Sequence, residues 1–217
     1  MSAAAVVIAN VTNIYFDVKG QSYGRQVADI LLGKITGEIE GAKVSIDDSF
    51  SQPVIFQSRE DATNGNQSGF KIDLYDRTDT HIQMYAEDGE LKIRYFEINP
   101  PKDGATDEYN AGHYDETIWT FDEAVYQGYE LKSLRFVRAN MGFNDDEEKN
   151  ELEKNARDSV DAWDTNDYPG NVVGVYLTLQ SPQYGEFYAY RYVKMYNLTD
   201  DEANSFTIPL QVSTEYK

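Results

Sequence analysis

Residues 81–95 read HIQMYAEDGELKIRY, and this stretch decides the fold class. Apolar side chains fall at every second position on both sides of Asp88-Gly89, which is the alternation of a half-buried β-strand. Asp and Gly both tolerate a positive φ, so a two-residue turn here predicts a β-hairpin. The stretch therefore indicates antiparallel β-structure.

The same alternation recurs along the chain between short segments rich in Gly, Asn and Asp. We expect strands at residues 6–16, 38–46, 54–57, 70–75, 82–86, 91–95, 117–121, 131–138, 172–179 and 187–196. Many short strands separated by turn residues favour a mostly β chain that folds as an antiparallel β-sandwich. Because no repeat or low-complexity linker interrupts the pattern, we interpret residues 1–217 as a single β-sandwich domain.

One α-helix is predicted as an insertion into this sandwich, at residues 144–164. Asn144 suits an N-cap, and the acidic residues 145–148 suit the first turn of a helix that spans about residues 145–163. An apolar stripe follows at helical spacing, formed by Leu152, Ala156, Val160 and Trp163. For residues 25–34, a helix and a strand remain alternatives.

Charge excludes whole classes of partner. The chain has 38 acidic and 19 basic residues and a formal net charge of −19. Nucleic-acid binding needs a broad cationic surface, which this composition cannot supply, so we expect no nucleic-acid partner. An anionic membrane would also repel the protein, whereas a neutral lipid surface, a glycan or another protein remains open.

Cysteine is absent, so the chain can form neither a disulfide nor a thiolate metal site, and we expect no cofactor. The apolar run at residues 3–8 follows no positively charged segment and is too short for a signal peptide. We therefore expect synthesis in the cytoplasm, with later release, or storage in inclusions, and action at a target-cell membrane as open alternatives.

Catalytic motifs are not evident, and we expect no enzyme. The two histidines, His81 and His113, lie outside any nucleophile-elbow, P-loop or HExxH pattern, and we interpret both as structural or solvated. A hydrolase that uses a carboxylate pair remains a third alternative. Residues 144–148 and 161–167 are rich in oxygen ligands, but they lack the spacing of a calcium loop, so we expect no metal site.

A row of tyrosines is the most specific candidate binding site. Tyr188, Tyr190, Tyr192 and Tyr196 share one face of the strand expected at residues 187–196. Either face of this strand could be the core. If the opposite face is buried, the tyrosines form an exposed row of the kind that stacks on sugars or lies at a lipid headgroup interface. The alternative is ordinary cross-strand packing between tyrosines.

The first half of the chain resembles the aegerolysin family. The resemblance lies in Met1-Ser2-Ala3 with residues 6–12, in residues 58–65 leading into residues 69–75, and in residues 91–100 followed by Gly112-His113. It implies a β-sandwich that recognises a membrane lipid or receptor and acts with a larger pore-forming partner, as in binary insecticidal toxins. The chain is longer than members of that family and carries the extra helix, and no site residue carries over.

The expected function is therefore a non-enzymatic β-sandwich that binds a membrane or a receptor, as one component of an insecticidal pore-forming system. The alternative is a structural assembly subunit, such as a virion, tail or inclusion-body protein, which would form homo-oligomers through unpaired strand edges.

Overall fold

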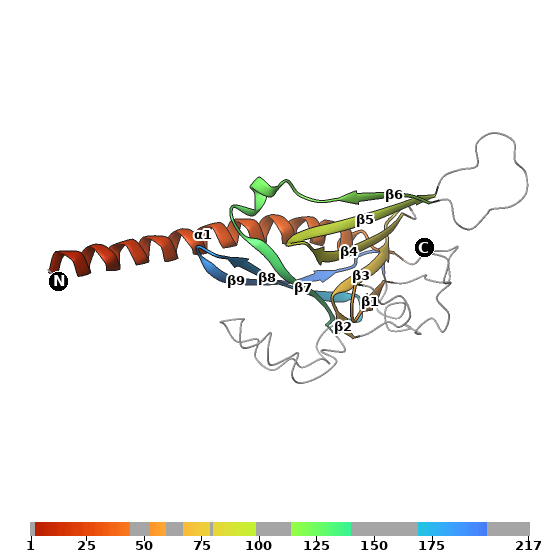
Figure 1. The fold of residues 1–217 in the computed structure, drawn as a ribbon. Helices are drawn as coiled ribbons and strands as arrows, with labels where there is room; N and C mark the ends of the chain where they lie inside the picture. The colour runs from red at the N-terminus through yellow and green to blue at the C-terminus, as the bar shows by residue number, and fades with distance from the viewer. Residues whose placement is uncertain are drawn as a thin grey trace, which may run out of the picture.

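The computed structural model of the chain describes residues 3–43, 53–59, 67–78, 80–98, 114–139 and 169–198. One long helix precedes a series of strands (Figure 1). In chain order the elements are α1 (Ala3–Glu40), β1 (Val54–Phe56), β2 (Ser68–Gly69), β3 (Lys71–Tyr75), β4 (His81–Glu87), β5 (Glu90–Ile98), β6 (Tyr114–Trp119), the 3-10 helix η1 (Glu123–Tyr126), β7 (Glu130–Arg138), β8 (Val172–Ser181) and β9 (Gly185–Lys194).

The strands form two antiparallel sheets, which confirms the predicted mostly β, sandwich-like fold. Sheet A has five strands in the order β1-β3-β4-β5-β6, and sheet B has four in the order β2-β7-β8-β9. The expected strands at residues 54–57, 70–75, 82–86, 91–95, 131–138, 172–179 and 187–196 correspond to β1, β3, β4, β5, β7, β8 and β9. The strand expected at residues 117–121 is β6, which begins three residues earlier and ends at Trp119.

The hairpin predicted at Asp88-Gly89 is confirmed. Both residues have a positive φ, 52° at Asp88 and 79° at Gly89. The flanking strands β4 and β5 pair directly across the turn, with Glu87 opposite Glu90. The residue types of the turn therefore predicted this hairpin correctly.

The strand expected at residues 6–16 is wrong, and so is the start of the one expected at 38–46, because residues 3–40 form the 38-residue helix α1. After a turn, Lys43 forms a β-bridge to Tyr75, and residues 44–46 lie outside the described residues. The segment at residues 6–12, which resembles the opening strand of the aegerolysins, is therefore helical. Residues 25–34 are helical as well, as one of the two alternatives had it.

A physical reason for the correction lies in helix cooperativity. Residues rich in Val and Ile favour strands when nothing else decides their conformation. Here the second half of α1 packs on the sheets, and a formed helix extends at little cost through residues that lack Gly and Pro. No Gly or Pro occurs between residues 3 and 19, so nothing stops the helix there.

Helix α1 and both sheets share one hydrophobic core. The inner face of the helix buries side chains at helical spacing, including Val27, Leu31 and Ile35, each with no exposed surface. In the same cluster lie Ile72, Ile82, Met84 and Ile93 from sheet A, and Leu134, Phe136, Val175 and Leu177 from sheet B.

The helical insertion predicted at residues 144–164 lies outside the described residues and stays a prediction.

Candidate functional site

Helix α1 leaves the body of the protein at Gly20. A Cβ atom at Gly20 would lie 2.7 Å from Cβ of Tyr184, and one at Gly24 would lie 2.6 Å from Cγ of Phe187. Both distances are too short for a side chain, so the two glycines allow the helix to approach the β8–β9 turn at Tyr184 and the start of β9 at Phe187. On the N-terminal side of Gly20, no described side chain is buried.

Residues 3–19 form what we term the projecting segment. At 1.5 Å per residue it extends about 25 Å beyond the last buried turn, and Figure 1 shows it reaching past the ends of both sheets. Asp17 and Lys19 are the segment's charged residues. Among the described residues, no helix is both long enough and apolar enough to cross a bilayer.

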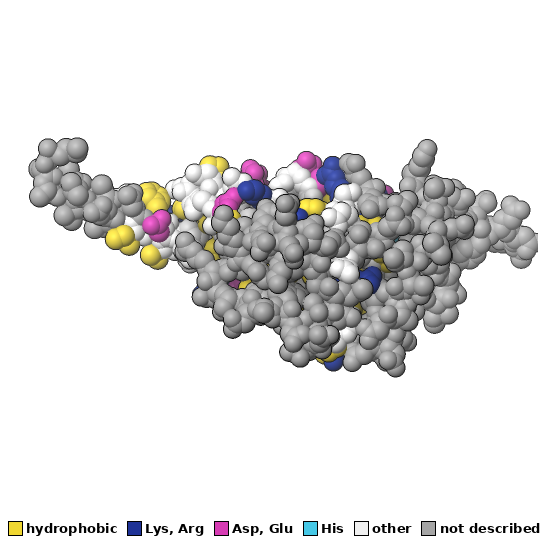
Figure 2. Space-filling model, turned by 90° about the horizontal axis from the view of Figure 1, so that it is seen from below, with side chains coloured by type: hydrophobic (Ala, Val, Ile, Leu, Met, Phe, Trp, Pro, Cys, Tyr) yellow, Lys and Arg dark blue, Asp and Glu magenta, His cyan; other side chains and the backbone are white. Residues whose placement is uncertain are grey.

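Large apolar side chains are exposed around this segment. Ile14 is 61% exposed, Tyr15 59%, Phe16 37% and Val18 65%. Consecutive helical residues are rotated by about 100°, so these side chains point to different sides of the helix rather than to one stripe. Figure 2 shows hydrophobic side chains exposed there beside an acidic one. A helix that is apolar on several sides is normally enclosed by partners.

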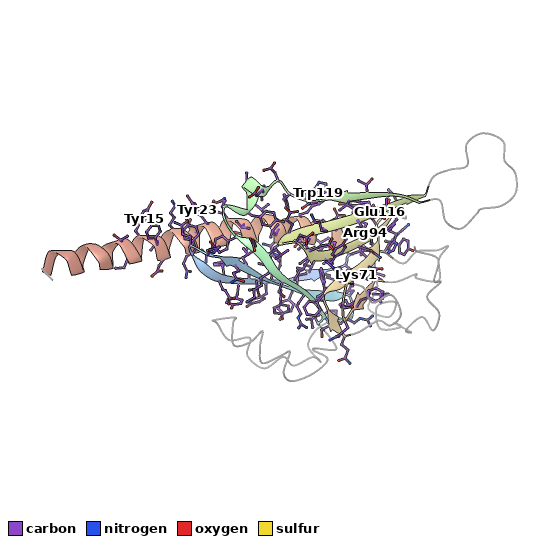
Figure 3. All side chains as sticks on the ribbon, viewed as in Figure 1. Tyr15, Tyr23, Lys71, Arg94, Glu116 and Trp119 are labelled. Atoms are coloured by element: carbon purple, nitrogen blue, oxygen red, sulfur yellow. The ribbon has the colours of Figure 1, made fainter. Side chains whose placement is uncertain are left out.

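A cluster of tyrosines surrounds the point where the helix leaves the body. Lys19 lies over the rings of Tyr15 and Tyr23, with Nζ 5.9 and 5.3 Å from their centroids. Tyr184 packs edge-on against Tyr23 and stacks on Tyr129. Tyr15, Tyr184 and Tyr23 together raise the pKa of Lys19, which keeps its ammonium charged. Figure 3 shows Tyr15 on the projecting segment and Tyr23 where α1 meets the body.

The body holds this junction by hydrogen bonds from one loop. Tyr129, just before β7, donates from its hydroxyl to the carbonyl oxygen of Gly20 at 2.9 Å. Gln127 donates to the side chain of Gln26 at 3.3 Å. The segment between η1 and β7 therefore lies against the first packed turns of α1.

The predicted tyrosine row is only partly assembled. Residues of β9 that face the core include Phe187, Ala189 and Val193, so the even positions face outward. Tyr188, Tyr190 and Tyr192 share that outer face, and Tyr190 is 42% exposed. Tyr196 is 69% exposed but follows the end of β9 in a turn, so it lies outside the strand row.

Sequence reasoning missed a fourth member of the row. Tyr176 of β8 pairs with Tyr190, and their rings stack at 5.7 Å. Its hydroxyl lies 2.9 Å from that of Tyr192. The alternation of β8 placed Tyr176 on one face, but the pairing register was needed to place it beside Tyr190.

His81 is buried between two aromatic rings. Its ring stacks between Tyr75 at 5.1 Å and Phe96 at 4.8 Å, and Nε2 lies 3.3 Å from Oδ2 of Asp73. Asp73 also accepts a hydrogen bond from Gln83 at 3.0 Å. This arrangement fixes the imidazole within sheet A. His113 lies outside the described residues.

An open, acidic hollow of about 770 Å³ lies between η1, the β4–β5 turn and the β8–β9 turn. Five carboxylates line it, and none of its described lining residues is basic; they are Asp88, Glu90, Asp122, Glu123 and Glu130. A hydrogen bond from Lys92 lowers the pKa of Glu90, whereas a general acid needs a raised pKa. Asp122 is occupied in capping η1.

Metal ligation is not evident in the part of the chain that the structure describes, where no group of three or more His, Asp or Glu side chains is arranged to hold a metal ion. Both segments considered for calcium, residues 144–148 and 161–167, lie outside the described residues.

The sequence carried a signal for the projecting segment. Residues 3–19 contain neither Gly nor Pro. Small or apolar residues then follow at every fourth position, namely Gly20, Gly24, Ala28 and Leu32. This pattern indicates one continuous helix, but the Val- and Ile-rich start concealed it.

No family model matches the sequence, and no curated protein matches it.

Proposed function

We propose that this chain is a non-enzymatic assembly subunit whose copies associate through the projecting segments of α1. The observation that carries the proposal is the exposure of Ile14, Tyr15, Phe16 and Val18 on different sides of a helix that has left its own body. Burying each such side chain is worth about 1.5–3 kcal/mol. A single flat surface would cover only one side of the helix, whereas several neighbouring helices would cover all of its sides.

Identical helices fit this segment better than a lipid interior does. The segment carries Asn10, Asn13 and Asp17 among its apolar residues. A charged or amide side chain is costly in hydrocarbon, but between helices it can lie at a polar seam or reach a partner. Association of one helix face with a different face of the next copy is heterologous, so it builds rings or filaments.

A concentration series of the full chain in sedimentation velocity tests the proposal. We expect the wild type to form particles larger than a monomer, and the double variant Ile14→Ser, Val18→Ser to remain monomeric at the same concentrations. The matched control is Ile118→Ser, Tyr196→Ser, because these two side chains on the body are similarly exposed, at 55% and 69%. A wild type that stays monomeric throughout, or a control that loses assembly equally, contradicts the proposal.

Binding to a lipid or receptor surface is the second candidate, and the outward tyrosines of sheet B favour it. Tyr190 presents an exposed ring, and Tyr188 and Tyr192 flank it on the same face. Flotation with zwitterionic phosphatidylcholine vesicles separates the two candidates: vesicle binding by a monomer that does not self-associate supports this one. An insecticidal role with a pore-forming partner stays a prediction of the aegerolysin resemblance alone.

A further inference from the structure

We infer, resting on the proposed assembly through α1, that electrostatic repulsion between the acidic bodies restrains this assembly and that salt releases it. The inference concerns the regulation of the projecting segment and follows from where the charges lie. Attraction and repulsion are carried by different parts of the molecule. The projecting segment has one acidic and one basic residue, whereas the whole chain has a net charge of −19.

Acidic groups lie close to the point where the helices would meet. The hollow lined by five carboxylates includes Gln127 and Tyr129 in its wall. Those two residues hydrogen-bond to Gln26 and Gly20 of α1, so the hollow adjoins the helix at the level where it leaves the body. The nearest exposed apolar residue, Val18, is about 3 Å along the helix from Gly20.

The charges at this level are not balanced. Lys92 pairs with Glu90 at 2.5 Å, and Arg191 lies 3.7 Å from Asp29 on the helix. Lys19 and Arg25 of α1 add positive charge nearby, but four further carboxylates of the hollow have no ion pair with a described residue. These are Asp88, Asp122, Glu123 and Glu130.

The spacing of packed helices is small enough for this repulsion to act between neighbouring copies. Packed helices lie about 8–10 Å apart, so the acidic hollows of neighbouring copies would approach to within a few such distances. The Debye length is about 30 Å at 0.01 M salt and about 8 Å at 0.15 M. Repulsion therefore acts across the assembly at low salt and is largely screened at moderate salt, while the apolar contacts between helices remain.

Sedimentation velocity of the full chain in a NaCl series tests the inference. We expect the concentration for half-assembly to fall about tenfold or more between about 10 and 150 mM NaCl. The variant Glu123→Gln, Glu130→Gln should reach the same half-assembly concentration at lower salt than the wild type. The control Glu40→Gln, Glu116→Gln removes the same charge far from the hollow, at the other end of α1 and on β6, and should shift the curve less.

The outcomes separate this inference from the proposed function. A wild type that remains monomeric at every salt concentration overturns the proposed function. Assembly that is independent of NaCl, or equal shifts in the two variants, overturns the inference and leaves the proposed function standing. A response to CaCl₂ far below the ionic strength at which NaCl acts would indicate a specific cation site, and would overturn diffuse screening as the cause.

Discussion

The hydroxyl of Tyr129 donates a hydrogen bond to the carbonyl oxygen of Gly20, 2.9 Å away, at the turn where α1 separates from the body. Tyr129 is buried, and its ring stacks on Tyr184, which lies against Gly20 itself. One side chain thus joins the start of β7, the β8–β9 turn and the base of the projecting segment.

Replacing Tyr129 by Phe should lower the free energy of unfolding by about 1 kcal/mol, because the Gly20 carbonyl loses the hydrogen bond from the hydroxyl while its helical hydrogen bond and the ring packing remain. Urea unfolding monitored by circular dichroism measures this change. A variant as stable as the wild type would show that the hydrogen bond contributes nothing.

Alkaline pH should destabilise the protein, and Tyr129 should contribute. Burial raises the pKa of Tyr129 and of Tyr126 above the ordinary tyrosine value of about 10. The folded state therefore holds these protons more tightly than the unfolded state does. Their contribution is complete below about pH 10 and is lost as pH rises through the raised pKa values. Stability measured between neutral pH and this range should fall less steeply in Tyr129→Phe than in the wild type; an equal slope contradicts the assignment.

Two glycines of α1 should respond to alanine in opposite directions. At Gly24 a Cβ would meet Cγ of Phe187 at 2.6 Å, whereas at Gly33 nothing lies within 4 Å. Gly33→Ala should stabilise the protein by about 1 kcal/mol through helix propensity. Gly24→Ala gains the same propensity, but it should be destabilising overall, because forcing a core contact costs about 1–3 kcal/mol. Thermal unfolding of both variants checks the prediction, and two changes of the same sign would contradict it.

Proteolysis should begin in the projecting segment when the protein is monomeric. Tyr15 and Phe16 are exposed, and a helix end with few buried contacts opens readily. Limited chymotrypsin digestion should cut there before it cuts at Tyr184 or Phe187, which pack against α1. Assembled protein should resist this first cut. Mass spectrometry identifies the fragments; early cleavage within the sheets would argue against a free segment.

The outward tyrosines should be dispensable for folding. Replacing Tyr190 and Tyr192 by Ala should leave cooperative unfolding intact, because the core-facing residues of β9 are Phe187, Ala189 and Val193. If this face binds lipid, the same variant should lose flotation with phosphatidylcholine vesicles. Loss of cooperative unfolding would show that these rings serve as core, where truncation of a large side chain costs about 3–5 kcal/mol.

The sequence alone determined the local β-structure. Period-two alternation and the Asp88-Gly89 turn are properties of neighbouring residues, and β3, β4 and β5 formed where those patterns predicted. Alternation also put Tyr188, Tyr190 and Tyr192 on one face, since this follows from strand geometry. It did not decide which face is buried.

Only the tertiary structure decided the role of the N-terminal segment. The Val- and Ile-rich residues 6–16 suit a strand or a helix locally, and the choice follows from the packing of Val27, Leu31 and Ile35 into the shared core. Tertiary contacts stabilise the second half of α1 as a helix, and cooperative hydrogen bonding carries the helix on into residues 3–19, where no described side chain is buried. The proposed function rests on the exposure of Ile14 and Val18. These two side chains are exposed because α1 leaves the sheets at Gly20, before it reaches them.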